Sequence, residues 1–476
     1  MDIFKQSSPD GTLRMNKFFG LFDNPDEISI PELTETQIEQ FQIYVSNLVE
    51  SFNNKDADVF LRWLKKIVYE INMQLPEEYF RIFINFKIFD LMINIMLNYP
   101  INEFQIYAIL ILLKACYFSN KVLYGLPFIT DQNLFLKFMK APPIETPEIN
   151  SKYSYISLYY SNLVHINLMN SPELSKAFYD SGLYHLFIKM CEPIEKKEYD
   201  YIYSWSSLIT YFSSSKFPFP ENDKVLLLQI YDKMYSNKDY PHYISAIDQL
   251  IDSSSDELNH IIFQTDIYPN LITILVQLES ETDMTNIENR KICMFILYKM
   301  ILKDKNYQLD LSFLPIDIVS DLMQKEDVSD QVSALQLLTI YLKKGYGKVK
   351  YSIITELIKK GVYDFLMKNY HKLSFGPKSI MVEFFILSLI QATPTELSIL
   401  NECEIFGPVL ENMDWANIDL VNLVNTFLKT VLNDGDLFAK FILPYSQLIF
   451  QIAEETDPQN ASVIDELCAR IDKVER

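Results

Sequence analysis

Glycine is scarce in this chain, with 10 residues out of 476 against an average usage of about 7%. Nucleotide-binding folds with glycine-rich phosphate turns need more glycine than this, and so do β-rich folds with many tight turns. Apolar and polar residues show no convincing alternation over the length of a strand, so the sequence predicts no β-sheet. A chain poor in glycine and rich in leucine and isoleucine favours helices joined by short polar turns.

Positive charge is also in deficit. The chain carries 42 Lys and Arg against 63 Asp and Glu, which gives a formal net charge of −21. Binding to nucleic acid or to anionic lipid depends on a broad basic surface, so we expect no nucleic-acid partner and no adhesion to membranes. The excess of acid favours solubility and a basic protein partner.

Cysteine is infrequent and forms no Cys-x-x-Cys pair. Each of the five thiols lies in or beside an apolar run: Cys116, Cys191, Cys293, Cys403 and Cys468. We interpret them as buried reduced thiols of a cytoplasmic or nuclear protein. The amino-terminal residues lack the apolar core of a secretory signal. The longest apolar stretch, residues 106–118, is shorter than the roughly 20 residues that cross a bilayer, so no membrane insertion is expected.

Catalytic motifs are missing from the sequence, which contains no HExxH, GxSxG, Walker loop, GxGxxG or kinase-type HRD. The histidines are scattered, and we interpret them as helix-surface or satisfied core residues rather than metal ligands: His165, His185, His242, His260 and His371. The sequence therefore predicts a protein that is no enzyme, with no catalytic residue, no metal site and no cofactor.

Helix starts, in contrast, are explicit. Residues 393–396 read Thr-Pro-Thr-Glu, which combines an N-cap Thr, Pro at the first helical position and Glu at the third. The Thr hydroxyl and the Glu carboxylate of such a capping box satisfy backbone N–H groups reciprocally. Residues 254–257 are expected to repeat the box, and Ser171-Pro172 supplies a cap and a Pro start.

One pattern recurs along the chain: a short helix, a polar or Gly turn, an aliphatic residue, an aromatic residue and another apolar helix. Its five clear copies have the aliphatic residue at 88, 183, 267, 362 and 405, and weaker copies lie at 134, 225, 314 and 443. The mean step is (443 − 88)/8, or about 44 residues. A period of roughly 40–47 residues with two or three helices is typical of armadillo and HEAT repeats.

With these turns and the long helix after each one, the chain resembles the armadillo-like helical repeat family over roughly residues 35–455. The resemblance implies an all-α fold, a right-handed α-solenoid of about nine armadillo-like repeats. In that family the turn contains a Gly with positive φ. Gly182 and Gly361 match it, and Asp266 and Asn133 are expected to take its place. The remaining two turns depart from the pattern, which leaves their construction open: Lys87 and Glu404.

Three regions follow from this reading: a flexible amino-terminal tail (1–31), the solenoid (32–460) and a carboxy-terminal capping helix (461–476). The tail is polar except for an apolar cluster at residues 17–22. We interpret that cluster as packing back on the first repeat, with a short docking motif as the alternative. In the solenoid the third helix of each repeat, such as residues 331–342 and 380–390, is apolar nearly all round, as a helix between two neighbours must be.

The third helices of armadillo-like proteins line a groove, and in peptide-binding members their Asn and Trp side chains hold an extended peptide. The resemblance places Asn162 and Asn425 near the expected Asn column. Trp205 is the corresponding Trp candidate, and we interpret it as partly buried packing, with a ligand platform as the alternative. This chain carries the pattern poorly, because Trp63, Trp205 and Trp415 form no array. A nuclear transport cargo adaptor is therefore disfavoured.

Charge is uneven, since residues 340–380 contain nine Lys against Glu356 and Asp364. A basic repeat beside acidic ones suits an acidic or phosphorylated partner, and the alternative is a solvated helical face of mixed charge. The loop after residue 342 has an aromatic residue between two glycines and supplies the remaining partner-binding candidates: Lys343, Lys344, Tyr346, Lys348 and Lys350.

These observations predict a non-catalytic protein–protein interaction scaffold that binds a protein or peptide partner along the solenoid groove. Two alternatives stay open. The first is an enzyme or enzyme-associated regulatory subunit with a site between repeats, which requires a deep pocket with convergent polar groups. The second is the nuclear transport cargo adaptor.

Overall fold

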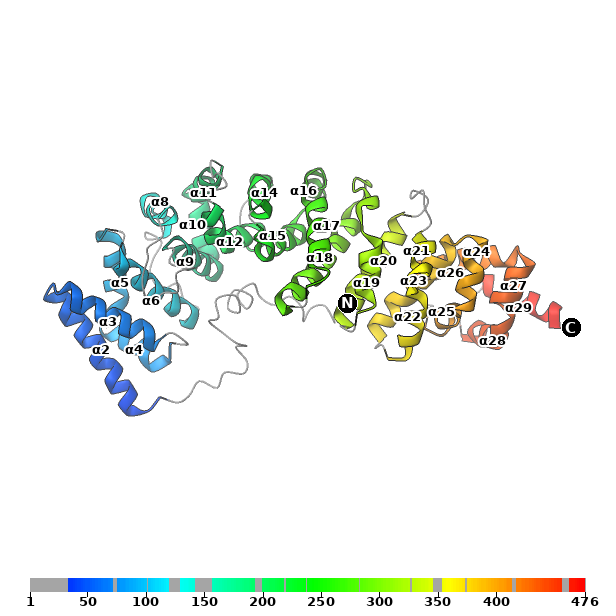
Figure 1. The fold of residues 1–476 in the computed structure, drawn as a ribbon, viewed down its shortest axis with the longest axis horizontal. Helices are drawn as coiled ribbons and strands as arrows, with labels where there is room; N and C mark the ends of the chain where they lie inside the picture. Colours follow the sequence, from blue (N-terminus) through cyan, green and yellow to red (C-terminus); the bar gives the residue numbers. More distant parts are fainter. Residues whose placement is uncertain are drawn as a thin grey trace. The chain divides into compact units, whose positions relative to one another are not determined.

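The computed structural model describes residues 33–71, 75–100, 102–119, 129–141, 156–192, 199–217, 220–236, 238–281, 283–325, 328–345, 353–372, 375–412, 417–455 and 462–475. Every element of regular structure in these ranges is a helix, so the predicted all-α class is confirmed (Figure 1). The chain divides into two compact units, residues 1–258 and 259–476. The predicted tail, residues 1–31, lies outside the described residues.

The first unit contains the helices drawn from blue to green in Figure 1. They are α2 (Glu35–Asn53), α3 (Ala57–Glu70), α4 (Glu77–Asn85), α5 (Ile88–Asn98), α6 (Glu103–Ser119), α8 (Gln132–Met139), α9 (Ile156–Asn170), α10 (Pro172–Asp180), α11 (Leu183–Cys191), α12 (Tyr199–Ser213), α13 (Glu221–Lys224), η2 (Val225–Leu227), α14 (Leu228–Ser236) and α15 (Tyr240–Ser253). The boundary between the units falls inside α16 (Asp256–Ile262).

The second unit contains the helices from green to red. They are α17 (Ile267–Leu278), α18 (Met284–Lys303), η3 (Leu311–Phe313), α19 (Ile316–Met323), α20 (Val328–Gly345), α21 (Ile353–Lys359), α22 (Val362–Asn369), η4 (Tyr370–Lys372), α23 (Phe375–Gln391), α24 (Pro394–Glu402), α25 (Phe406–Asn412), α26 (Ile418–Leu432), α27 (Gly435–Phe441), η5 (Leu443–Tyr445), α28 (Ser446–Glu455) and α29 (Ser462–Glu475).

Long helices stack in a row within each unit. In the first unit α3 packs on α6, α6 on α9, α9 on α12 and α12 on α15; in the second, α18 packs on α20, α20 on α23, α23 on α26 and α26 on α29. Each predicted turn leads into a second helix, and the long helix after it begins at residue 103, 156, 199, 240, 284, 328, 375, 418 or 462, a mean step of (462 − 103)/8, or about 45. We call these stacking helices, together with α3, the third helices.

Hydrogen bonds and ion pairs between neighbouring repeats follow the same period. Ser207 Oγ donates to Asn162 Oδ1, 45 residues earlier in the chain. Lys360 Nζ and an oxygen of Asp321 are 3.0 Å apart across 39 residues. Each unit is thus a helical-repeat structure in which one repeat completes the polar contacts of the next. The right-handed sense, the total of about nine repeats and the limits of the solenoid and capping helix stay predictions.

The glycine turns have the expected left-handed backbone, whereas the turn at Asp266 does not. Gly182 and Gly361 have φ values of 78° and 69°, in the left-handed region. Lys87 and Glu404 adopt the same region, with φ values of 52° and 58°, although their side chains disfavour it. The expected substitute Asp266 does not, because its φ is −76°. The other expected substitute, residue 133, lies inside α8.

The weaker turn copies have a different construction. Three of them form or adjoin a short 3-10 helix: η2, η3 and η5. In the fourth copy the turn residues already belong to α8, which starts at an N-cap whose Asp131 side chain accepts from Leu134 N. Four of the five clear copies therefore enter the second helix through a left-handed residue, and none of the weaker copies does.

The left-handed turns give a matched pair of stability predictions. Gly361→Ala should destabilise the second unit by about 1 kcal/mol, because a Cβ is strained at positive φ even where nothing lies within 4 Å. Glu404→Gly should stabilise it by about 0.5–1 kcal/mol, because Gly relieves that strain at an exposed position. Urea unfolding followed by circular dichroism measures both changes. Equal signs for the two variants would contradict this account of the turns.

The predicted helix caps are partly confirmed. Thr393 and Glu396 form the expected capping box, and Ser171 caps a helix with Pro at its first position. At residues 254–257 the prediction is wrong about which carboxylate accepts the hydrogen bond from the backbone N–H of the cap. Ser255 Oγ accepts from Leu258 N, but the Ser255 N–H donates to Glu221 of α13 rather than to a local Glu. The box is closed by the preceding repeat, which local sequence cannot show.

Lysines of one repeat also cap helices of the repeat before it. Lys137 Nζ donates to the carbonyls of Met96 and Tyr99 at the end of α5, at 3.2 and 2.9 Å. Lys233 bonds the carbonyls at the end of α11 in the same way, and so does Lys325 at the end of α17. A cation at a helix carboxyl end satisfies orphan carbonyls and complements the helix dipole. The three lysines are 96 and 92 residues apart, so this contact recurs in every second repeat.

Among the described residues, no single helix is both long enough and apolar enough to cross a membrane. Helices α16 and α17 have the length and apolar composition of a membrane span only when they are taken together, and the pair is bent by 65°.

Candidate functional site

Four side chains recur at about the repeat spacing on successive third helices of the second unit: Tyr298 on α18, Lys343 on α20, Glu383 on α23 and Asn425 on α26. They are 45, 40 and 42 residues apart, which is the repeat length, and their helices pack in this order. Lys343 is exposed, and the other three side chains are half-buried. We call this set the third-helix column.

An ion pair holds the middle of the column. Lys343 Nζ lies 2.9 Å from Glu383 Oε1, and the two side chains are 49% and 27% exposed. The pKa of Tyr298 is raised by burial first and by Glu383 second, and lowered by Lys343. The three groups therefore lie within electrostatic reach of one another. Because water reaches the ion pair, it contributes only about 0–1 kcal/mol, and a partner can compete for either charge.

Aromatic and cationic groups extend the column along α18. The rings of Phe295 and Tyr298 have centroids 6.2 Å apart and an interplanar angle of 10°. Lys299 Nζ lies 4.3 Å from the Phe295 ring centroid, a favourable cation–π distance. Half-exposed aromatic rings with a few charges are the composition that interface hot spots share.

Asn425 closes the column with an acceptor that lacks a donor. Its Oδ1 is buried and accepts no hydrogen bond from the residues that the structure describes. An unsatisfied buried acceptor costs about 1–3 kcal/mol. A donor that reaches this oxygen therefore gains more than it would at the open surface.

Three of the nine lysines in residues 340–380 form ion pairs in the structure. Besides the Lys343 pair, Lys359 Nζ lies 2.8 Å from Glu356 Oε1, and Lys360 Nζ lies 3.0 Å from Asp321 Oδ2. The carboxylates at positions 321 and 383 come from neighbouring repeats, outside the stretch. The observed surface is therefore one of mixed charge at these three lysines, which is the alternative to a basic docking patch.

The side chains of the two described loop candidates, Lys343 and Lys344, point in different directions. Lys344 turns away from the column: its Nζ donates to the Asp304 carbonyl at 3.3 Å and lies 5.6 Å from the Tyr307 ring centroid. Lys343 faces the column instead. The other three loop candidates lie outside the described residues: Tyr346, Lys348 and Lys350.

The two candidates of the first unit are buried. Asn162 is 2% exposed, and its Oδ1 accepts from Ser207 at 2.6 Å. Trp205 is 1% exposed, and its Nε1 donates to the Met139 carbonyl at 3.2 Å. Both polar groups link neighbouring repeats, so a partner reaches neither without parting the helices. Of the residues proposed from sequence, Lys343 is the one that the structure places in a side-chain contact between neighbouring third helices, with Glu383.

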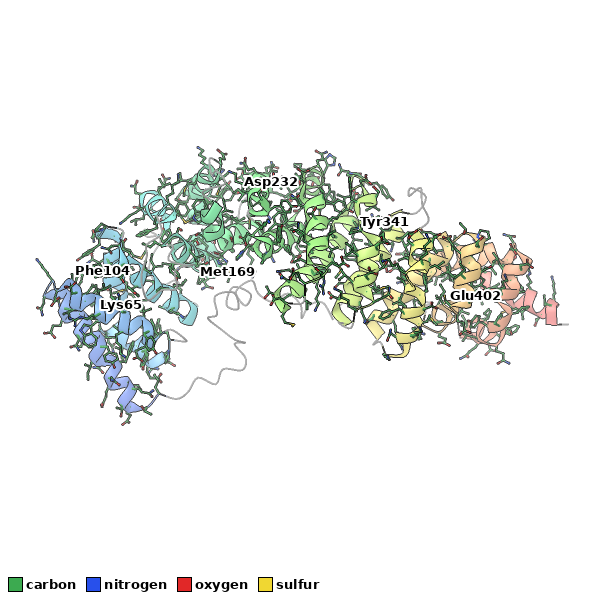
Figure 2. The ribbon with its side chains drawn as sticks, in the orientation of Figure 1. Lys65, Phe104, Met169, Asp232, Tyr341 and Glu402 are labelled. Carbon is green, nitrogen blue, oxygen red and sulfur yellow. The ribbon has the colours of Figure 1, made fainter. Side chains whose placement is uncertain are left out.

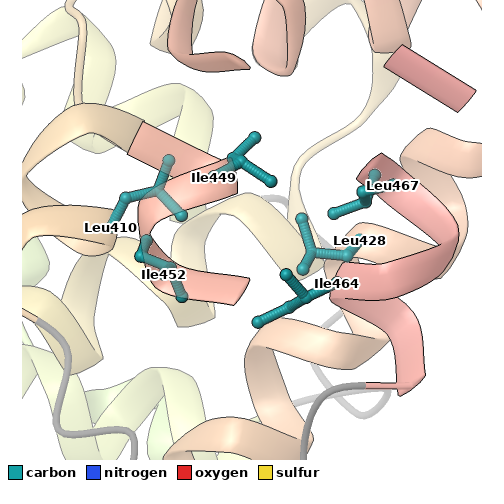
Figure 3. A pocket seen from close by; sticks show the side chains of 6 residues that line it. All are labelled: Leu410, Leu428, Ile449, Ile452, Ile464 and Leu467. Carbon is teal, nitrogen blue, oxygen red and sulfur yellow. The ribbon is translucent and has the colours of Figure 1, made fainter. Parts of the chain in front are cut away.

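A small apolar pocket lies at the end of the second unit (Figure 3). Side chains from α25, α26, α28 and α29 line it: Leu410, Leu428, Ile449, Ile452, Ile464 and Leu467. Its volume is about 10 Å³, about one water molecule, whereas small-molecule sites occupy about 300–1,000 Å³. The pocket is a packing defect between these four helices and lacks the polar groups that chemistry requires.

Histidine and carboxylate chemistry is equally limited. Among the described residues no group of three or more His, Cys, Asp or Glu side chains is placed to hold a metal ion. Burial lowers the pKa of His165 to about 4, so this imidazole stays neutral at ordinary pH. His242 Nδ1 lies 2.7 Å from Asp239 Oδ1, and Asp239 Oδ2 accepts from Ser206 at 2.9 Å. This chain of contacts ties the start of α15 to α12.

The His242 contact predicts a dependence of stability on pH. Burial lowers the pKa of His242, but the charge and hydrogen bond of Asp239 outweigh burial and raise it above 6.5. The stabilisation that the His242–Asp239 contact gives to the folded first unit is therefore fully present below the unfolded pKa of about 6.5. It is lost as pH rises through the folded pKa. We expect the first unit to lose stability on going from mildly acidic to alkaline pH, because the protonated imidazole that pairs with Asp239 is then lost. Urea unfolding at several pH values should show this loss in the wild type and not in His242→Gln.

Sequence reasoning missed Tyr298, Glu383, Phe295 and Lys299. The available signal was their spacing, because Tyr298 and Glu383 lie 45 residues before and 40 residues after Lys343. Glu383 is also a single charge inside an otherwise apolar helix, residues 380–390. A charge in that setting indicates a face that the stacking does not cover.

Comparison with known proteins bears on the fold. No family model matches the sequence, and no curated protein does either. The crystal structure of an engineered protein from the Northeast Structural Genomics Consortium is similar over 90% of this chain and 99% of its own, with 11% identity and a TM-score of 0.58. UNC-45 from Drosophila melanogaster aligns with 91% of this chain and 72% of its own at 12% identity, but the TM-score of 0.25 is too low to support an argument.

At 11% identity the engineered protein shows a shared fold and nothing about activity. Together with the recurring turns and the rows of third helices in each unit, these findings make the chain an all-α helical-repeat protein.

Proposed function

We propose that this chain is a non-catalytic interaction scaffold with armadillo-like repeats, which holds a protein partner along the third helices of its second unit. The third-helix column is the observation that carries the proposal. It places an aromatic ring, a cation, a carboxylate and an amide at repeat spacing on successive third helices, and the first three groups lie within electrostatic reach of one another. An extended segment of a partner would meet one of these groups at each repeat.

The chemistry of the column suits a peptide better than a small substrate. The ion pair and the amide offer donors and acceptors along a line, while the Tyr298 and Phe295 rings offer apolar contact. The pocket at the end of the unit is too small for a ligand. We assign the protein to the cytoplasm or nucleus, in keeping with buried free thiols at Cys116, Cys191 and Cys293.

Site-specific photo-crosslinking tests the proposal. Benzoylphenylalanine in place of Tyr298 should crosslink a partner, and the same group in place of Lys359, whose side chain is 64% exposed on α21, should not. A partner captured equally at both positions would show non-specific contact and contradict the proposal.

A partner that is identified by crosslinking and then purified allows a second test, which reverses the charges of the third-helix column. Lys343→Glu should weaken binding by about tenfold, or about 1.4 kcal/mol, because it breaks the pair with Glu383 and places two carboxylates together. The reversed pair Lys343→Glu/Glu383→Lys restores the internal contact. Binding that returns fully in the reversed pair would show that the column only holds the fold, and would contradict direct contact.

A further inference from the structure

A second surface with a defined chemistry lies on the first described repeat of the first unit. Tyr44 comes from α2, and Trp63, Lys66, Tyr69 and Glu70 come from α3. Helices α2 and α3 pack together, and the neighbouring Lys65 marks α3 in Figure 2. This surface is independent of the third-helix column, so the fate of one proposal does not decide the other.

An ammonium group sits inside this cluster. Lys66 Nζ lies 5.3 Å from the Tyr44 ring centroid and 5.8 Å from the Tyr69 ring centroid, and 2.8 Å from Glu70 Oε1. The Trp63 ring stacks on Tyr44, with centroids 5.6 Å apart and an interplanar angle of 28°. Two aromatic faces and a carboxylate around one cation are the elements of an ammonium-binding site.

Helix α4 lies on the buried side of this cluster. Tyr79 of α4 is 5% exposed and stacks on Phe41 with centroids 3.6 Å apart. Burial raises the pKa of Tyr79, and Glu70 and Tyr44 raise it further. Glu70 and Tyr44 therefore lie near the Tyr79 hydroxyl, and the carboxylate and the Tyr44 ring are backed by packed structure rather than by solvent.

The front of the cluster is open. Tyr69 is 74% exposed, and the Lys66 and Glu70 side chains are 42% and 30% exposed. Ile43, which precedes Tyr44 in α2, is 56% exposed. At its own exposure the Tyr69 ring adds little to the core and is open to contact with a partner.

Lys66 is held weakly in its place. An exposed Lys–Glu pair four residues apart on a helix is among the weakest ion pairs, because water screens it and two long side chains lose freedom. Its flexible stem allows the ammonium to leave the rings for solvent without any change in the helix. The rings and the carboxylate stay where they are, so the site persists without its occupant.

We propose that Tyr44, Trp63, Tyr69 and Glu70 form a binding site for a lysine side chain of a partner protein, with Lys66 as the resident ammonium that the partner's lysine replaces. The position of Lys66 Nζ shows the chemistry that the site accepts. Charge agrees with this occupant: residues 33–100 contain 6 Lys and Arg against 9 Asp and Glu, a net charge of 6 − 9 = −3, within a chain of net charge −21. A negative surface attracts a basic partner.

The experiment compares two lysines that carry the same charge. Lys66→Ala empties the proposed site, while Lys65→Ala removes an equal charge from a lysine that pairs with Glu103 at 2.8 Å and lies over a different ring, Tyr107. The probes are N-acetyl-lysine methylamide and its trimethyl-lysine and norleucine counterparts. The readout is the ¹⁹F resonance of 5-fluorotryptophan at Trp63, assigned with Trp63→Phe.

We expect Lys66→Ala to bind the lysine probes about tenfold more tightly than the wild type, as for a site that its own occupant fills about nine tenths of the time. Lys65→Ala should behave like the wild type, and Lys66→Ala/Tyr69→Leu should lose the gain. Lys66→Met should bind poorly, because an uncharged chain then covers the rings.

Three outcomes would overturn the site. An equal gain in Lys65→Ala would reduce the effect to net charge, and an equal response to norleucine would reveal an apolar patch without selectivity for cations. Absence of any response in folded Lys66→Ala would show that no ammonium site exists there. Unchanged circular dichroism and thermal unfolding of the variants establish that they are folded, since the substituted lysine and Tyr69 are exposed or half-buried.

Discussion

Replacing Arg290 by methionine is expected to destabilise the second unit by about 3–5 kcal/mol, because it removes the guanidinium that pairs with a buried carboxylate. Arg290 lies on α18 and bonds Asp330 of α20, and their side chains are 2% and 0% exposed. Its other guanidinium nitrogen donates to the carbonyls of Leu278 and Glu279 at the end of α17, at 3.1 and 3.3 Å. One side chain thus joins three helices of two neighbouring repeats.

The double variant Arg290→Met/Asp330→Leu separates charge from packing. Replacing both members of a buried ion pair by apolar residues is often nearly neutral, so this variant should recover most of the loss. Lys359→Met is the matched surface control, because its ion pair with Glu356 is exposed at both ends and should change stability by less than about 1 kcal/mol.

Hydrogen exchange measures the effect where it arises. Protection should fall at the carboxyl end of α17 and the start of α20 in Arg290→Met, since each repeat is stabilised mainly by its neighbours. A variant that unfolds at the same urea concentration as the wild type, with unchanged protection in those helices, would contradict a structural role for the pair.

Periodicity predicted the turns and the third helices because burial imposes them. An aliphatic and an aromatic residue every 44 residues must enter a core, and helices that are apolar all round must lie between neighbours. The left-handed turns at Lys87 and Glu404 escaped prediction for the converse reason. There the packing of the repeat fixes the backbone, and the local residue tolerates the strain.

The candidate surface was harder to predict, because a nearly uniform apolar helix does not show which side stays open. Asn162 and Trp205 were chosen by residue type, and both are buried between repeats. Lys343 was chosen for a basic stretch, yet its partner Glu383 lies 40 residues away. A contact between two residues that are one repeat length apart leaves no trace in a local sequence pattern. It can be predicted only when the sequences of the repeats are aligned on each other.

Phe385→Ala is the second large expected effect, a loss of about 3–5 kcal/mol in the stability of its repeat. Phe385 is 0% exposed on α23, with ring centroids of Tyr363 and Phe384 at 6.3 and 6.1 Å. Removing the ring leaves a cavity between α22 and α23 that stiff neighbouring helices cannot close.

The loss should spread to adjoining repeats and stop there, because α20 and α26 both pack on α23 and stability in repeat proteins passes through nearest neighbours. Hydrogen exchange should therefore show reduced protection in α20, α23 and α26, and wild-type protection in the first unit. Phe313→Ala, at a 60% exposed position, is the matched control and should stay within about 0.5 kcal/mol of the wild type. A uniform loss of protection over all described helices would mean that the chain unfolds as one cooperative body, and the nearest-neighbour description of its repeats would fail.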